Sequence, residues 1–164
     1  MVHLPQQVAV KVLSPSLSRY AGYVKYFNRQ AEMAVGLRHP HICRILDYGQ
    51  AVVQLGTEPS MVVNYLSMEL MEGGSLADRV AQGTPFELSQ IVSWLDDVSN
   101  ALETAHGQGV THGGLKLSSI TFDRAGEPYV TDFAMACRAD DQAELVFLGS
   151  PDFLAPELWE CSRP

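Results

Sequence analysis

The sequence predicts an α+β fold in which a small sheet with one helix is followed by a mainly helical part. A short alternating run of β-branched residues near the N-terminus precedes a helical pattern of apolar residues, and two further apolar runs typical of strands come next. After them lies a long amphipathic segment with apolar residues at three- and four-residue spacings. We expect the sheet-containing part over residues 1–71 and the helical part over residues 72–164.

The N-terminal part is predicted to contain three strands and one helix. Its first strand reads Q-V-A-V-K-V-L and is closed by a Ser-Pro-Ser turn. The helix ends at Arg38-His39-Pro40, because the ring of Pro40 cannot continue it. A turn-rich segment over residues 49–59 joins the other two strands. The predicted bounds are 7–13 for the first strand, 17–37 for the helix, and 42–48 and 60–71 for the last two strands.

The C-terminal part is predicted to begin with a short helix that ends near Gln82, followed by a long helix that ends at Gly107 or Gly109. Two short strands over residues 120–122 and 128–131 flank a turn. The apolar stripe of the long helix predicts its buried face, and its polar side chains are expected to face away. The stripe consists of Ile91, Leu95, Val98, Leu102 and Ala105, and the polar set of Asp96, Asp97, Asn100 and Glu103.

Composition excludes several classes of function. Of the 164 residues, 46% are hydrophobic and 18% are charged, which is typical of a globular protein. The net charge of −8, with no dense basic run, argues against binding to nucleic acid or to an anionic membrane. No apolar run approaches a membrane span and no signal-peptide pattern is present, so a cytoplasmic protein is expected. Cys43, Cys137 and Cys161 are far apart, which predicts neither a disulfide framework nor a zinc site.

Five segments carry the functional signal, and their order and spacing matter more than any one of them. The first is Val8-Ala9-Val10-Lys11, and the second is Arg38-His39-Pro40-His41-Ile42. The third is His112-Gly113-Gly114-Leu115-Lys116, and Asp132-Phe133-Ala134 begins eighteen residues after Gly114. The fifth is Ala155-Pro156-Glu157, which ends twenty-five residues after Asp132. Together they resemble the protein kinases, and most closely the Ser/Thr kinases of the bacterial eukaryote-like type.

The resemblance implies an ATP site between the two parts of the chain. Lys11 would hold the α- and β-phosphates, and Ala9 would cover the adenine. Met68 would be the gatekeeper, and Glu69-Leu70-Met71 the hinge whose backbone pairs with the adenine edge. Thr121 stands where a Leu-like residue is expected under the adenine, which predicts weak nucleotide binding.

The same resemblance shows where the catalytic groups have changed. Gly114 stands at the position of the catalytic Asp, and Ser119 stands at that of the magnesium-binding Asn. Lys116 and Asp132 remain as remnants of the site, so Mg²⁺ would be left with Asp132 and, as a weaker ligand, Ser119. Nineteen residues after Lys11, Gln30 takes the place of the helix Glu that normally pairs with the strand Lys. Glu32 lies about 200° further around the helix and does not face the same target.

These departures favour a pseudokinase with a regulatory or binding role, an unidentified protein partner and at most weak binding of ATP and Mg²⁺. A Ser/Thr protein kinase with impaired activity, and a decayed or truncated coding fragment, are the alternatives. By resemblance, the chain starts at the family's third strand and stops before the helices that follow Ala-Pro-Glu. We therefore expect an incomplete two-lobe fold without the glycine-rich loop.

Overall fold

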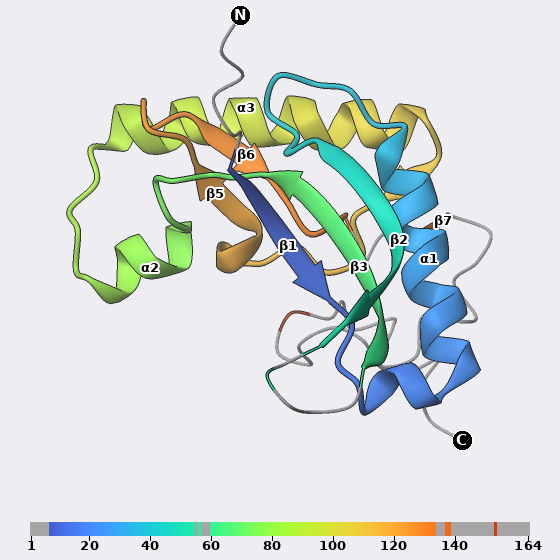
Figure 1. Cartoon of the computed structure of the whole chain (residues 1–164). Helices are drawn as coiled ribbons and strands as arrows, with labels where there is room; N and C mark the ends of the chain where they lie inside the picture. Colours follow the sequence, from blue (N-terminus) through green and yellow to red (C-terminus); the bar gives the residue numbers. More distant parts are fainter. Residues whose placement is uncertain (1–6, 55, 57–59, 134–136, 139–152, 154–164) are drawn as a thin grey trace, which may run out of the picture.

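A computed structural model describes residues 7–54, 56, 60–133, 137–138 and 153 of the chain. The N-terminal elements form an antiparallel sheet with the strand order β1-β3-β2, covered on one side by helix α1 (Figure 1). A 3-10 turn, η1, lies between β1 and α1. The elements are β1 (Val8–Val12), η1 (Leu17–Arg19), α1 (Ala21–Val35), β2 (Ile45–Val53) and β3 (Met61–Glu69). The predicted α+β order of strand, helix and two strands is therefore confirmed.

Strand β2 is longer than the sequence predicted. It continues to Val53 and covers residues 49–53, which the turn-forming residues had assigned to a loop. Its pairing with β3 runs from Ile45 opposite Met68 to Val53 opposite Met61, with an irregularity between Ile45 and Asp47. Cross-strand pairing in the hairpin therefore overrides the local preference of Gly49 for a turn, as is common for strands.

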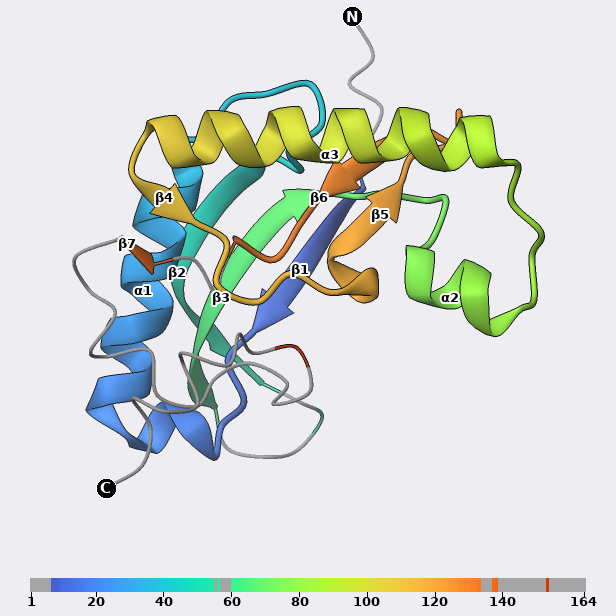
Figure 2. The ribbon, with the colours of Figure 1, turned by 180° about the vertical axis from the view of Figure 1, so that it is seen from behind.

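The remaining elements form a helical part with small two-stranded sheets. Strand β5 pairs with β6, and β4 pairs with β7, both antiparallel. The long helix α3 packs against β4 and β6 (Figure 2). A capping box starts α2, because Ser75 and Asp78 each accept a hydrogen bond from the backbone N–H of the other. The elements are α2 (Leu76–Ala81), α3 (Leu88–Gly107), β4 (Val110–Thr111), η2 (Leu117–Ser119), β5 (Ile120–Phe122), β6 (Pro128–Val130) and β7 (Cys137–Arg138).

Helix α3 ends at Gly107 as predicted, and its predicted buried face is correct at Val98 and Ala105 but wrong at Leu95. Its buried side chains are Trp94, Val98, Ala101 and Ala105, whereas Leu95 is 58% exposed. Trp94 determines this orientation, since its ring packs on that of Phe122 with 4.7 Å between the centroids. The centre of the buried face is thereby shifted by roughly 50° around the helix from the predicted stripe, because Val98 and Ala105 belong to both. Asp97, expected to face away, instead lies with its Oδ1 3.4 Å from Nε2 of His41.

The loop after α1 joins the two groups of elements through backbone hydrogen bonds. Ile42 forms an isolated parallel bridge with Val130 of β6. The N–H of Cys43 donates to the carbonyl of Val130 at 2.9 Å, and the N–H of Val130 donates to the carbonyl of His41 at 2.8 Å. A continuous apolar core extends across this junction and includes Ala34, Leu66, Val98, Val110 and Val130. Within the described ranges, no helix has the length and apolar character needed to span a membrane.

Candidate functional site

Lys11 and Asp132 lie together, although 121 positions separate them in the sequence. The Nζ atom of Lys11 donates to Oδ1 of Asp132 at 3.0 Å, and both side chains are partly exposed. Lys11 is positioned by β1, where it pairs opposite Leu66 of β3. Asp132 has a φ of 62°, in the left-handed region that non-glycine residues seldom adopt. Such backbone conformations are held by surrounding structure and gather at functional sites, so this pair is the centre of the candidate site.

His112 fixes the loop that the sequence singled out. Its ring is buried, and Nε2 lies 2.8 Å from the carbonyl oxygen of Thr131. The backbone N–H of Gly114 donates to Nδ1 at 3.3 Å, so Nδ1 carries no proton and Nε2–H is the donor to Thr131. The ring also lies 4.8 Å from that of Phe133, centroid to centroid. His112 thus connects the loop at Gly114 to the segment that carries Asp132.

In this loop, Gly114 occupies the position at which the resemblance leads us to expect a catalytic carboxylate. Gly114 has no side chain, and its carbonyl accepts a hydrogen bond from Oγ of Ser119 at 3.4 Å. Ser119 is completely buried. Its backbone N–H donates to the carbonyl of Lys116, and its own carbonyl accepts from the N–H of Thr131, both at 2.9 Å. Ser119 therefore holds the loop together from inside.

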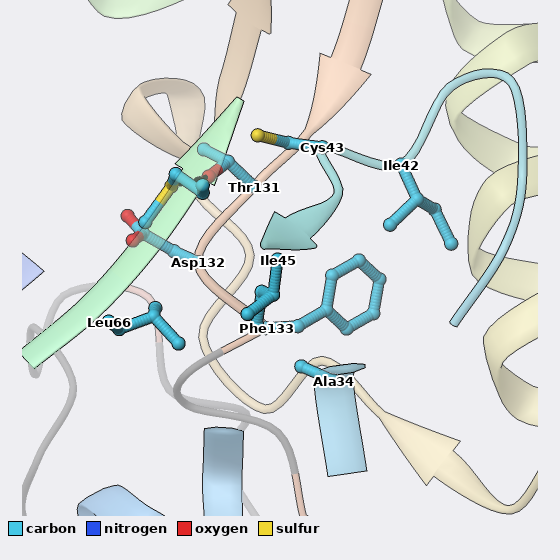
Figure 3. A pocket seen from close by; sticks show the side chains of 9 residues that line it. Ala34, Ile42, Cys43, Ile45, Leu66, Thr131, Asp132 and Phe133 are labelled. Atoms are coloured by element: carbon cyan, nitrogen blue, oxygen red, sulfur yellow. Dashed lines mark hydrogen bonds between the residues drawn. The ribbon is translucent and has the colours of Figure 1, made fainter. Parts of the chain in front are cut away.

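Asp132 also lines a small pocket of about 10 Å³ (Figure 3). Met68 lies at one side of it and accepts a hydrogen bond on Sδ from Oγ1 of Thr131 at 3.5 Å. That volume has room for a single water molecule at most, so the pocket is no site for a purine ring. Its lining is Ala34, Ile42, Cys43, Ile45, Leu66, Met68, Thr131, Asp132 and Phe133.

Cys43 and Thr131 line this pocket, and sequence reasoning did not single them out. The Cys43 thiol donates to the carbonyl of Glu69 at 3.3 Å. Burial raises the pKa of Cys43 to about 11, so the thiol stays protonated and is a poor nucleophile near neutral pH. Their positions in the sequence could have indicated a place near the site, because Thr131 directly precedes Asp132 and Cys43 directly follows the Arg-His-Pro-His-Ile segment.

The residues proposed to contact a nucleotide come from three strands and the segment after β3. Ala9 of β1 lies opposite Met68 of β3. Thr121 of β5 pairs with Tyr129, and its hydroxyl donates to the carbonyl of Tyr129 at 3.4 Å. Glu69 ends β3, and its carboxylate is 3.1 Å from Nε of Arg44. Met71 follows in the segment that leads to α2, where it is half-buried.

The acidic partner of Lys11 in the structure comes from Asp132 and not from α1. Gln30 lies in α1 as predicted, and the position of its side chain is outside the described part of the structure. Glu32, two residues further along the helix, is exposed. Among the described side chains, the ammonium group of Lys11 thus has the carboxylate of Asp132 as its acidic partner.

Comparison with known proteins identifies the family. The family model described as the protein kinase domain matches residues 3–163, and the chain belongs to this family, as a member of its bacterial eukaryote-like branch. The chain is 30% identical over 160 residues to serine/threonine-protein kinase PknB of Mycobacterium leprae, covering 95% of this chain and 25% of that protein. It is 30% identical over 158 residues to serine/threonine-protein kinase PknA of Mycobacterium tuberculosis, covering 94% of this chain and 36% of that protein. The chain thus spans between a quarter and about a third of the length of these relatives.

The buried His112 predicts a loss of stability on mild acidification. Burial lowers the pKa of His112 below its ordinary value of 6.5, so the unfolded chain binds more protons than the folded one between the two values. The contribution of His112 to the free energy of unfolding is then fully present above about pH 6.5. It is lost as the pH decreases from 6.5 toward the lowered pKa of the folded state. Chemical denaturation at about pH 7.5 and about pH 5.5 should give a lower free energy of unfolding at the lower pH.

Two measurements separate His112 from other titrating groups. Replacement by His112→Gln should flatten this pH dependence, whereas His106→Gln, at an exposed position, should preserve it. An NMR titration of the unaltered protein gives the pKa of the His112 ring directly and does not depend on the variant folding. A His112 pKa at or above 6.5 would contradict the prediction.

Proposed function

We propose that this chain is a pseudokinase domain that binds adenine nucleotide weakly and acts through a protein partner. The observation that carries the proposal is the absence of a side chain at Gly114, combined with the retained pair of Lys11 and Asp132. In the protein kinases the residue at the Gly114 position accepts the proton of the substrate hydroxyl. A positioned general base contributes roughly 10²–10⁴-fold to a reaction rate, and glycine supplies none of it.

The surrounding contacts support binding without transfer. His112, Thr131 and Ser119 hold the loop and the Asp132 segment in one arrangement by hydrogen bonds between buried groups. Lys11, which would meet the phosphates in a kinase, has Asp132 as its acidic partner. Phosphoryl transfer in the family depends on a proton-accepting Asp and a magnesium-binding Asn, and by resemblance Gly114 and Ser119 stand at those two positions.

A kinase with impaired activity is the second candidate, favoured by the Lys11–Asp132 pair itself. Both residues occupy the family positions for phosphate and metal binding, and they lie 3.0 Å apart. In this case another group would have taken over the proton transfer that the missing Asp performs in the family. The two candidates differ in one measurable quantity, the rate of phosphoryl transfer.

The test combines a transfer assay with a binding assay on the purified full-length protein. We expect no measurable transfer of the γ-phosphate of ATP to a generic Ser/Thr substrate. We also expect a small, saturable rise in the thermal unfolding midpoint with ATP, because a ligand that binds only the folded state stabilises it. Lys11→Met should reduce that rise. Robust phosphoryl transfer by the unaltered protein, abolished by Lys11→Met, would establish that it is an active kinase. A thermal unfolding midpoint that does not change with ATP would rule out nucleotide binding.

A further inference from the structure

His41 lies where the loop after α1 meets both α3 and β6, and the proposed function makes no use of it. Its Nδ1 atom is 2.8 Å from the carbonyl oxygen of Pro128 in β6. Its Nε2 atom is 3.4 Å from Oδ1 of Asp97 in α3, and both side chains of this pair are largely shielded from solvent. One side chain in the loop therefore contacts two separate elements of the helical part.

Both oxygen atoms beside the ring accept hydrogen bonds and have no proton to donate. A neutral imidazole has a single N–H, so in either tautomer the other nitrogen would turn its lone pair toward the carbonyl or the carboxylate oxygen. The imidazolium has an N–H on each nitrogen and suits both neighbours. The two contacts of His41 therefore favour the charged ring, which pairs with the carboxylate of Asp97 across the junction.

Among the described contacts of the His41 ring, two further titratable groups face it, and both are neutral. His39, in the same loop, has its ring 5.8 Å away between centroids, and its Nδ1 accepts from the backbone N–H of His41 at 3.2 Å. Burial, followed by the charge of His41, lowers the pKa of His39. The ring of Tyr129 in β6 is 6.0 Å away between centroids, and burial raises the pKa of its phenol. Asp97 is thus the charged partner of His41.

We propose that protonation of His41 is a switch on the junction between the sheet and the helical part. The charged ring ties the loop to α3 through Asp97 and to β6 through Pro128. The shorter contact, with Pro128, keeps a proton on Nδ1, so the ring gives up the proton on Nε2 and loses its ion pair with α3. The tie is therefore present at mildly acidic pH and is lost as the pH rises and the ring is deprotonated. This sign is opposite to that of His112, and the inference does not depend on nucleotide binding.

The ¹⁵N NMR signals of the two ring nitrogens in the unaltered full-length protein test the assignment without any substitution. Histidine side chains change charge between about pH 5 and 8, so spectra at about pH 5.5 and about pH 8.5 bracket the transition. We expect His41 to carry protons on both nitrogens at the lower pH and on Nδ1 alone at the higher pH. A neutral ring at the lower pH, or a proton on Nε2 alone at the higher pH, would overturn the proposal.

Hydrogen exchange at the same two pH values measures the junction itself. The amides of Cys43 and Val130 donate to carbonyls across it, so they exchange when the loop separates from β6. Their protection factors, divided by those of amides in the central strand β3 to remove changes in global stability, should fall about two- to fivefold as the pH rises. Asp97→Asn should remove this fall. Asp96→Asn, the matched control at an exposed position of α3, should retain it. An equal fall in the Asp97→Asn variant, or none in the unaltered protein, would contradict the proposal.

Discussion

Gly114→Asp combined with Ser119→Asn should give measurable phosphoryl transfer in the full-length protein, where the unaltered sequence gives none. Asp at position 114 restores a proton acceptor worth about 10²–10⁴-fold, and Asn at position 119 restores the second metal ligand of the family. Either substitution alone should leave transfer undetectable, since residues that act together in catalysis do not contribute additively. Adding Gln30→Glu should raise the rate further, because an acidic partner on α1 releases Asp132 from Lys11.

The structure favours the substitution at position 114 and disfavours the one at position 119. Gly114 lies outside the left-handed region, so its backbone conformation suits a residue other than glycine, whereas the neighbouring Gly113 has a φ of 71°. Ser119 is completely buried, and Asn must fit a larger side chain into that space. A thermal unfolding curve should accompany every assay, with Ser119→Ala as the small control. Equal phosphoryl-transfer activity in the unaltered protein and the double variant would show that Gly114 is not the cause of inactivity.

Gly73→Ala is expected to destabilise the fold by about 3 kcal/mol, which is large for the addition of one methyl group. A Cβ at Gly73 would lie 2.4 Å from the carbonyl oxygen of Asp123 and 2.8 Å from that of Phe122. These are backbone atoms that cannot move aside cheaply. The N–H of Gly73 also donates to the carbonyl of Phe122 at 2.7 Å, so the collision would strain the contact between the segment after β3 and strand β5.

Urea denaturation measures this effect, and Gly22→Ala supplies the matched control. Gly22 lies in α1, and a Cβ there would meet nothing within 4 Å. Replacing a helical glycine with alanine should stabilise the protein by up to about 1 kcal/mol. Equal and small effects of the two substitutions would mean that the close approach at Gly73 does not exist in solution.

The sequence predicted the fold class and element order because those depend on strong, local patterns. The alternation around Lys11 and the stop at Pro40 identified β1 and the end of α1 within a few residues. The extent of β2 depends on cross-strand pairing with β3, which no window of the sequence contains. The buried face of α3 depends on Trp94 meeting Phe122, a contact between distant segments. The division at residue 71 and the roles of the proposed nucleotide-binding residues stay predictions.

At the candidate site, motif spacing indicated which residues belong together, but not how they interact. The spacing of eighteen residues from Gly114 to Asp132 was enough to expect both at one site. The resemblance led us to expect Lys11 and Asp132 at one site, facing one another, but it did not state their direct ion pair, which depends on the acidic groups near Lys11 in three dimensions. Likewise, Ser119 is an ordinary polar residue in the sequence, and only folding buries its hydroxyl against Gly114.

The bridge between Ile42 and Val130 also limits how the sheet can move against the helices. Pulling them apart at this point would strip buried N–H and carbonyl groups of Cys43, Val130 and His41 of their partners, at a cost of about 1–3 kcal/mol for each group. Rotation about the same point keeps those hydrogen bonds. If the site between Lys11 and Asp132 opened, residues 41–43 and Val130 would therefore be expected to act as the pivot of that motion.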